Sequence, residues 1–123
     1  MKTYYYYYRD SKRAPIITVC LIKDGYDIAR GVTIRSPLDL LEKSEGRKYA
    51  KKYAKKALAR KHLGIKASSG AINRPEVFAI LLTALDPKGN SVMLTEDDHI
   101  FDFKSTFNPQ LTEFEKKLLR KAR

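Results

Sequence analysis

The chain has 123 residues, a formal net charge of +11 and a hydrophobic content of 43%. This length fits one domain with a modest core, and the hydrophobic content excludes a disordered chain. The single cysteine, Cys20, excludes a disulfide framework and a cysteine-based metal site. Small domains with such an excess of cations typically meet polyanions such as DNA, RNA or an anionic membrane face, although a basic surface also serves solubility alone.

The sequence contains no segment that would direct the chain into a membrane. Lys2 is followed by tyrosines rather than by the apolar run of a signal peptide. No apolar stretch reaches the length of a membrane span. We therefore expect an intracellular, cytoplasmic protein without a membrane partner.

The first 13 residues, MKTYYYYYRDSKR, combine five consecutive tyrosines with cations and stand apart from the rest of the chain. Tyrosine favours strands, so residues 1–13 fit a half-buried strand. A mobile basic arm is a second interpretation. Stacking of the tyrosine rings on exposed bases is a third. The sequence leaves all three open.

A β-hairpin is predicted after this segment. Residues 14–22 (APIITVCLI) are β-branched and apolar, and residues 27–36 (DIARGVTIRS) carry a second strand pattern. The Asp24-Gly25 pair between them is typical of a tight turn with positive φ.

The second strand of this hairpin is irregular in sequence. Ile28, Val32 and Ile34 keep a period of two, but Arg30 interrupts it. The neighbouring Gly31 then predicts a β-bulge.

Two helices are predicted next. Residues 36–43 (SPLDLLEK) begin with Ser36, a good N-terminal cap. Residues 44–46 (SEG) either interrupt this helix or start the second one. The second helix, residues 46–61 (GRKYAKKYAKKALARK), is strongly basic and is expected to stop at Gly64.

The C-terminal half is predicted to hold a further apolar helix over residues 74–85, because its apolar side chains repeat at helical spacing. Residues 86–90 (DPKGN) form a turn. Short strands are expected at residues 91–95 (SVMLT) and 99–103 (HIFDF), and a last helix within residues 108–123, capped by Asn108. The predicted apolar stripe of that helix is Leu111, Phe114, Leu118 and Leu119.

These elements predict an α+β fold in a single domain over residues 14–123. Its order is an N-terminal β-hairpin, a basic amphipathic helix packed on the sheet, a second apolar helix, short strands and a C-terminal helix. Residues 1–13 add a Tyr-rich basic arm or strand.

On a helical wheel the basic helix divides into two faces. Its apolar face comprises Ala50, Tyr53, Ala54, Ala57 and Leu58, and its lysine face comprises Lys48, Lys51, Lys52, Lys55 and Lys56. Lysines four residues apart repel each other by a few tenths of a kcal/mol. Phosphates opposite this face would turn the repulsion into attraction and release counterions. An ordinary solvated lysine surface is the alternative.

The predicted nucleic-acid-binding residues are Arg47, Lys48, Lys51, Lys52, Lys55, Lys56 and Arg60. Lysine is a point charge and reads base edges poorly, so we expect phosphate contacts with weak sequence preference. The cations of the last helix are explained by favourable placement near a helix C-terminus. Acids gather elsewhere, at Asp86, Glu96, Asp97, Asp98 and Asp102, which predicts one basic and one acidic face.

No catalytic site is predicted. His62 and His99 are the only candidates for a base at neutral pH. The acids around His99 lack the characteristic spacing of metal ligands, and Asp102-Phe103-Lys104 matches only half of a metal-dependent nuclease motif. Walker-type and dinucleotide-binding loops are absent. The chain is therefore interpreted as a non-enzyme that uses no cofactor and no metal, and a metal-dependent nuclease with Asp102 and Lys104 is the least favoured alternative.

A hairpin followed by GRKYAKKYAKKAL resembles the second half of double-stranded RNA-binding domains, over about a third of the chain. The resemblance implies that Lys48, Lys51 and Lys52 face phosphates bridging a groove. The chain departs from that pattern because SPLDLLEKSE separates strand from helix and no first helix precedes the hairpin.

A broader resemblance spans most of residues 16–119. The sequence ARG followed by SPLD, GR opening a helix, and FDFKSTFNPQLTEFE are similar to small, functionally uncharacterised proteins of phages and prophages of Gram-positive bacteria. This resemblance implies a phage context in the cytoplasm of a bacterial host cell. It implies no activity and no functional residues.

The sequence thus supports two functional hypotheses. In the first, the lysine-rich helix binds nucleic acid non-specifically through phosphate contacts. In the alternative, the chain is a protein-interaction module, for example a phage inhibitor, that docks on an acidic host protein. Both partners attract cations, so the charge pattern does not separate them.

Overall fold

The computed structural model describes residues 1–34, 43–61, 83–90 and 105–121. Within these residues the fold is mixed α and β, as predicted. The elements in chain order are β1 (Lys2–Arg9), β2 (Pro15–Asp24), β3 (Asp27–Ile34), α1 (Lys43–Arg60), β4 (Ser105–Phe107) and α3 (Glu113–Lys121).

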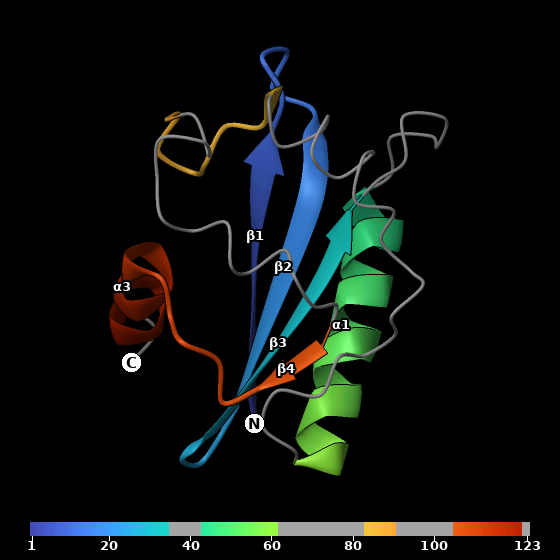
Figure 1. Cartoon of the computed structure of the whole chain (residues 1–123), viewed down its shortest axis with the longest axis vertical. Coiled ribbons are helices and arrows are strands. Elements are labelled where there is room, and N and C mark those ends of the chain that lie inside the picture. The colour runs from blue at the N-terminus through green and yellow to red at the C-terminus, as the bar shows by residue number, and fades with distance from the viewer. Residues whose placement is uncertain (35–42, 62–82, 91–104, 122–123) are drawn as a thin grey trace.

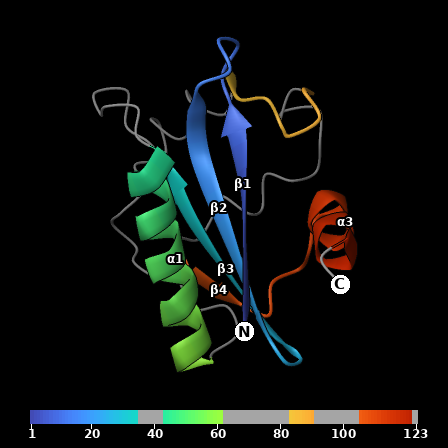
Figure 2. The same cartoon turned by 180° about the vertical axis from the view of Figure 1, so that it is seen from behind.

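The described strands form an antiparallel sheet in the order β1-β2-β3-β4, with a helix on each face (Figure 1). Helix α1 packs on β3, β2 and β4, whereas the side chains of α3 pack against the opposite face of β1 and β2. The view from behind shows the same separation of the two helices (Figure 2). Because both faces are covered, β2 is apolar along nearly its whole length rather than alternating.

The tyrosine run forms the edge strand β1, paired with β2 from Lys2↔Lys23 to Arg9↔Pro15. Of the interpretations left open by the sequence, the strand is the conformation that this segment adopts. Successive side chains of a strand point to opposite faces. Tyr6 and Tyr8 are accordingly buried on the α3 side, where the Tyr6 ring lies 5.0 Å from that of Phe114.

The predicted hairpin is present as β2 and β3. Its register runs without a shift from Ile17↔Ile34 to Asp24↔Asp27. The two-residue loop has Gly25 at its first position with a φ of 62°, the conformation that a type II′ turn requires.

The predicted bulge at Gly31 is wrong, since Gly31 pairs regularly with Cys20. A glycine is required at this position because the backbone of α1 approaches it closely. A Cβ atom at Gly31 would lie 1.9 Å from the carbonyl oxygen of Ala50 and 2.6 Å from the amide nitrogen of Ala54. Helix α1 therefore rests directly on the backbone of β3.

Helix α1 runs from Lys43 to Arg60 without an interruption at residues 44–46. Its Gly46 faces β2, where an added Cβ would lie 2.5 Å from Oγ1 of Thr18. The helix ends earlier than the predicted stop at Gly64. Lys61 already has a φ of 49°, and its amide donates to the carbonyl of Ala57 to complete the last turn.

Several predicted elements lie outside the described residues. These are the helix at residues 36–43, apart from Lys43, the strands at residues 91–95 and 99–103, and most of the helix at residues 74–85. At the end of that last range, Leu85 forms an antiparallel bridge with Arg9 instead of a helical turn. The predicted turn at residues 86–90 is present, and Gly89 supplies its positive φ of 88°.

The last helix begins later than predicted. Asn108 does not cap this helix but pairs with β3 just after β4. Its backbone amide donates to the carbonyl of Ile28, and its side-chain Oδ1 accepts from the backbone amide of Ile28. The cap is Thr112, whose Oγ1 accepts from the Glu115 amide while Oε1 of Glu115 accepts from the Thr112 amide. This reciprocal capping box explains why α3 starts at Glu113.

A buried ion pair joins α3 to the sheet. Arg30 of β3 is 2% exposed and Glu115 is 0% exposed, and the two side chains form a bidentate pair. The hydroxyl of Tyr6 donates to Oε2 of Glu115 at 2.9 Å, and Arg30 also donates to the carbonyl of Gln110 at 2.9 Å. Burial and the neighbouring Glu115 carboxylate raise the pKa of Tyr6 well above its usual value. Each charge is thus compensated, as buried charges require.

We predict that Gly31→Ala lowers the free energy of unfolding by about 3 kcal/mol, because the new methyl group would overlap the backbone of α1. Urea denaturation measures this loss. The control is Gly25→Ala, whose Cβ meets nothing within 4 Å and which loses about 1 to 2 kcal/mol through its positive φ alone. A smaller loss at Gly31 than at Gly25 would contradict the close approach of α1.

We also predict that Glu115→Gln destabilises the protein by about 3 to 5 kcal/mol, because the buried Arg30 loses its counter-charge. Glu113→Gln is the matched control. Glu113 forms an exposed ion pair with Lys116, and its loss costs at most about 1 kcal/mol. Equal thermal stability of the two variants would refute the role given to Arg30 and Glu115.

Candidate nucleic-acid interface

The lysine face of α1 lies on the outside of the molecule. Ala50, Ala54 and Ala57 are buried against the sheet, as the helical wheel predicts. Lys48, Lys52, Lys55 and Lys56 are exposed, Lys51 is half-buried, and Arg47 and Arg60 are exposed at the two ends of the helix. The predicted residues therefore share one continuous helix surface.

The charge of this surface is not balanced within the described residues. Helix α1 contains eight cationic residues and one acid, Glu45. The ion pairs in the described part of the chain are Arg30–Glu115, Lys61–Asp27 and Lys116–Glu113. None of these pairs includes a residue of the predicted interface. The lysine face consequently offers several cations to an external anion.

Two lysines lie close to the sheet at the side of α1. Cys20 of β2 is 0% exposed, and burial raises the pKa of its thiol to about 12. The positive charges of Lys51 and Lys55 oppose this rise. Lys51 and Lys55 follow Arg47 at intervals of four residues, so the three side chains share one side of α1, and Arg47 contacts tyrosines of β1. Lys51 and Lys55 thus lie on the side of the helix that faces β2.

Arg47 connects the lysine face to the edge strand. Its guanidinium lies 5.8 Å from the ring centre of Tyr5 and 5.8 Å from that of Tyr7, and its Nε donates to the Tyr7 hydroxyl. Arg9 lies 5.3 Å from the ring centre of Tyr7. These are cation–π contacts. We call Tyr5, Tyr7, Arg9 and Arg47 the aromatic ledge.

Of these four residues, only Arg47 was among the predicted nucleic-acid-binding residues, although stacking of the tyrosine run on bases was one interpretation of residues 1–13. The signal for Tyr5 and Tyr7 is the alternation of a strand, since Tyr6 and Tyr8 are buried and the residues between them face the other way. Tyr5 is half-buried beside Cys20, and burial together with this thiol raises the pKa of Tyr5. The alternation does not show which face of the sheet α1 covers, and therefore does not show that Tyr5 and Tyr7 lie beside this helix.

A second group of cations lies on the opposite side of the sheet. Lys116, Lys117 and Arg120 are exposed on α3. The pKa of Lys117 is lowered because the positively charged Lys88 lies beside it. Arg120 donates to the carbonyl of Lys116, as expected for a cation near a helix C-terminus.

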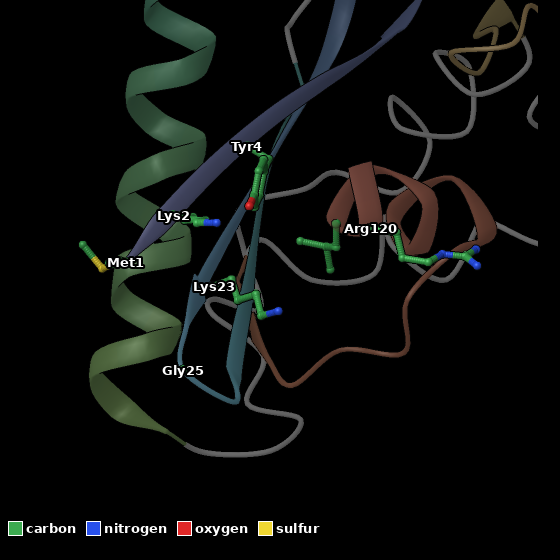
Figure 3. Close-up of a pocket in the computed structure, with 7 residues that line it drawn as sticks. Met1, Lys2, Tyr4, Lys23, Gly25 and Arg120 are labelled. Carbon is green, nitrogen blue, oxygen red and sulfur yellow. The ribbon is translucent and has the colours of Figure 1, made fainter. Parts of the chain in front are cut away.

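A shallow pocket of about 320 Å³ opens on the α3 side. It is lined by Met1, Lys2, Tyr4, Lys23, Gly25, Leu119 and Arg120. Lys2 and Lys23 lie near each other beside Tyr4, while the guanidinium of Arg120 extends away from them (Figure 3). The pocket is small and lies away from the lysine face, so it does not extend the predicted interface.

Most of the residues considered for catalysis or for an acidic face lie outside the part of the chain that the structure describes. His62, His99, Asp97, Asp98 and Asp102 lie outside the described residues, so the proposed acidic face is not described either. Asp86 lies in a turn, where its side chain accepts from the amides of Lys88 and Asn90. The described residues contain no group of three or more potential metal ligands, and neither described helix could span a membrane.

Comparison of the chain with protein-family models, with curated proteins and with solved structures finds no match. The resemblances to phage proteins and to double-stranded RNA-binding domains therefore remain predictions from the sequence.

We predict that Cys20 of the folded protein does not react with a disulfide reagent such as DTNB at pH 8. Cys20 is covered by α1, and with a pKa of about 12 only roughly one thiol in ten thousand is a thiolate at that pH. The urea-unfolded protein should react with one equivalent. Rapid reaction of the folded protein would show that α1 does not cover this part of the sheet.

Proposed function

We propose that the chain binds nucleic acid without strong sequence preference, through phosphate contacts of the lysine face of α1. The observation that carries the proposal is the one-sided charge of this helix. Its small apolar residues pack on the sheet, while Lys48, Lys52, Lys55 and Lys56 are exposed and have no acidic partner among the described residues.

The alternative explanation is that the lysines only keep the protein soluble. A solubilising helix surface usually mixes acids with lysines, because opposite charges four residues apart stabilise a helix whereas like charges destabilise it. In α1 the repulsions between Lys48 and Lys52, between Lys51 and Lys55 and between Lys52 and Lys56 lower the stability of the helix. A bound polyanion offsets this repulsion and releases counterions, so binding stabilises the helix.

The dimensions of the helix fit a phosphate backbone. From Lys48 to Lys56 the helix rises about 12 Å, and phosphates of one strand follow each other at about 3.4 Å along a duplex. About four to eight phosphates are therefore within reach of the lysine face and its flanking Arg47 and Arg60. Phosphate contacts carry no information about the base sequence, so we expect the lysine face to bind different sequences with similar affinity.

The first test is fluorescence anisotropy of labelled DNA and RNA over a series of salt concentrations. The logarithm of the binding constant should fall linearly with the logarithm of the salt concentration, with a slope for duplex DNA of about −0.9 per phosphate contact. With four to eight contacts we expect a slope between about −4 and −7.

The matching variants carry equal changes in net charge on opposite sides of the sheet. Lys48→Glu, Lys52→Glu and Lys55→Glu together should abolish binding and flatten the salt dependence. Lys116→Glu, Lys117→Glu and Arg120→Glu together should leave most of the binding intact, because α3 lies on the other face. Circular dichroism checks that both variants are folded.

Equal loss of binding in the two triple variants would show that net charge, and not the face of α1, drives the interaction. Absence of binding by the wild-type protein even at low salt would contradict the proposal. That result would favour the other partner suggested by the charge pattern, an acidic protein.

A further inference from the structure

The aromatic ledge lies at the margin of the core: Tyr5 packs against the cluster of Cys20 and the helix alanines but is not fully buried, in contrast to Tyr6 and Tyr8 on the other face. The described core is formed on the α3 side by Tyr6, Tyr8 and their neighbours, and on the α1 side by Cys20 and the alanines of the helix. Tyr5 and Tyr7 are only half-buried, at the edge strand of the sheet.

The path of α1 explains why this ledge remains beside the helix. Near its start, Gly46 of α1 contacts Thr18 of β2, which pairs with Tyr7. One turn and two turns later the helix rests on Gly31 of β3. The helix therefore crosses the sheet obliquely, from β2 toward β3, and packs on β2, β3 and β4 rather than along β1. In both views β1 lies on the far side of β2 and β3 from α1 (Figures 1 and 2).

The oblique path also brings cations to the ledge. Arg47 follows Gly46 directly, where α1 lies over Thr18 of β2, and its guanidinium lies 5.8 Å from the ring centres of both Tyr5 and Tyr7. Arg9 approaches Tyr7 from the same strand at 5.3 Å. Lys51 and Lys55 lie on the side of α1 that faces β2. The two rings are thus bordered by flat guanidinium groups on one side and by ammonium groups along the helix.

We infer that the nucleic acid bound by this protein is single-stranded, with its phosphates along the lysine face of α1 and one or two bases on the rings of Tyr5 and Tyr7. This inference rests on the proposed function and names its substrate class. Aromatic rings stack on the faces of unpaired bases, which a duplex keeps inside its helix, and a guanidinium plane can stack in the same way. Side chains two residues apart on a strand lie about 7 Å apart, so each ring has room for its own base.

The affinities for single-stranded and duplex nucleic acid show whether the aromatic ledge takes part in binding. A protein that used only the lysine face would bind a duplex at least as well as a single strand, because the duplex has the higher charge density. A protein that also used the rings would prefer the single strand. Stacking on aromatic residues tolerates all bases, so oligo-dT and oligo-U of equal length are suitable probes.

The test is a comparison of anisotropy titrations with oligo-dT, oligo-U and a duplex DNA of the same length. Tyr5→Leu and Tyr7→Leu each remove a ring but keep an apolar side chain. Each should weaken binding of the single strands by roughly 5- to 100-fold and leave duplex binding unchanged. Tyr26→Leu, at the fully exposed tip of the hairpin, is the matched control and should change neither.

Arg47→Lys provides a second variant that does not depend on the fold of β1. Arg47 is exposed, and lysine keeps its charge while removing the planar group. The variant should lose affinity for single strands but keep the slope of the salt dependence. Ultraviolet crosslinking of the wild-type protein to iodouracil-substituted oligo-dT should place the adduct on Tyr5 or Tyr7.

Equal affinity for single strands and duplex, with Tyr5→Leu and Tyr7→Leu unchanged, would overturn this inference and leave the lysine face as the binding surface. Crosslinks that fall only outside β1 would overturn it as well. Failure of the wild-type protein to bind any of the three polymers would instead overturn the proposed function itself, so the two failures are distinguishable.

Discussion

The contact between the backbone of α1 and Gly31 is the constraint on which the arrangement of the molecule depends. Only a residue without a side chain allows Ala50 and Ala54 to lie so close to β3. Gly46 has the same effect over Thr18 of β2. Together the two glycines set the height and the direction of α1 on the sheet. They thereby determine which residues of the helix face the solvent and which of them reach β1.

The neighbouring residue holds the other face of the sheet. Arg30 and Gly31 are adjacent in β3, so their side chains point to opposite faces. Gly31 receives α1, and Arg30 anchors α3 through the buried carboxylate of Glu115. This carboxylate accepts hydrogen bonds from Arg30, from the Tyr6 hydroxyl and from the amide of Thr112. Edge strand, central strand and C-terminal helix therefore meet at one buried group. The packing of α1 on β2 and β3 of this sheet places the lysine face beside the aromatic ledge of β1.

Local patterns predicted much of the local structure, and most errors arose where a distant contact decides. The start of α3 is an exception, because its capping box of Thr112 and Glu115 is a local signal that the prediction missed in favour of Asn108. The hairpin, its Gly25 turn and the two faces of α1 followed from periodicity and turn chemistry, which depend on neighbours in sequence. Gly31 was interpreted as a bulge because sequence alone does not show that a helix backbone lies above it. Arg30 likewise broke the strand pattern without revealing its partner, which lies 85 positions away. For the candidate site, the exposure of the lysine face was predictable from the helical wheel. The aromatic ledge was not, because Arg47 meets Tyr5 and Tyr7 only through the oblique path of α1.

If α1 and the adjacent part of β1 form one binding surface for a polynucleotide, nuclear magnetic resonance of the ¹⁵N-labelled protein titrated with a short oligo-dT locates the contact on the folded chain. We expect amide shift changes grouped in α1 from Arg47 to Lys56 and at Tyr5 and Tyr7 in β1, with little change in α3. Shift changes grouped on α3 or around the pocket at Lys2 and Lys23, with α1 unaffected, would contradict the proposed binding surface.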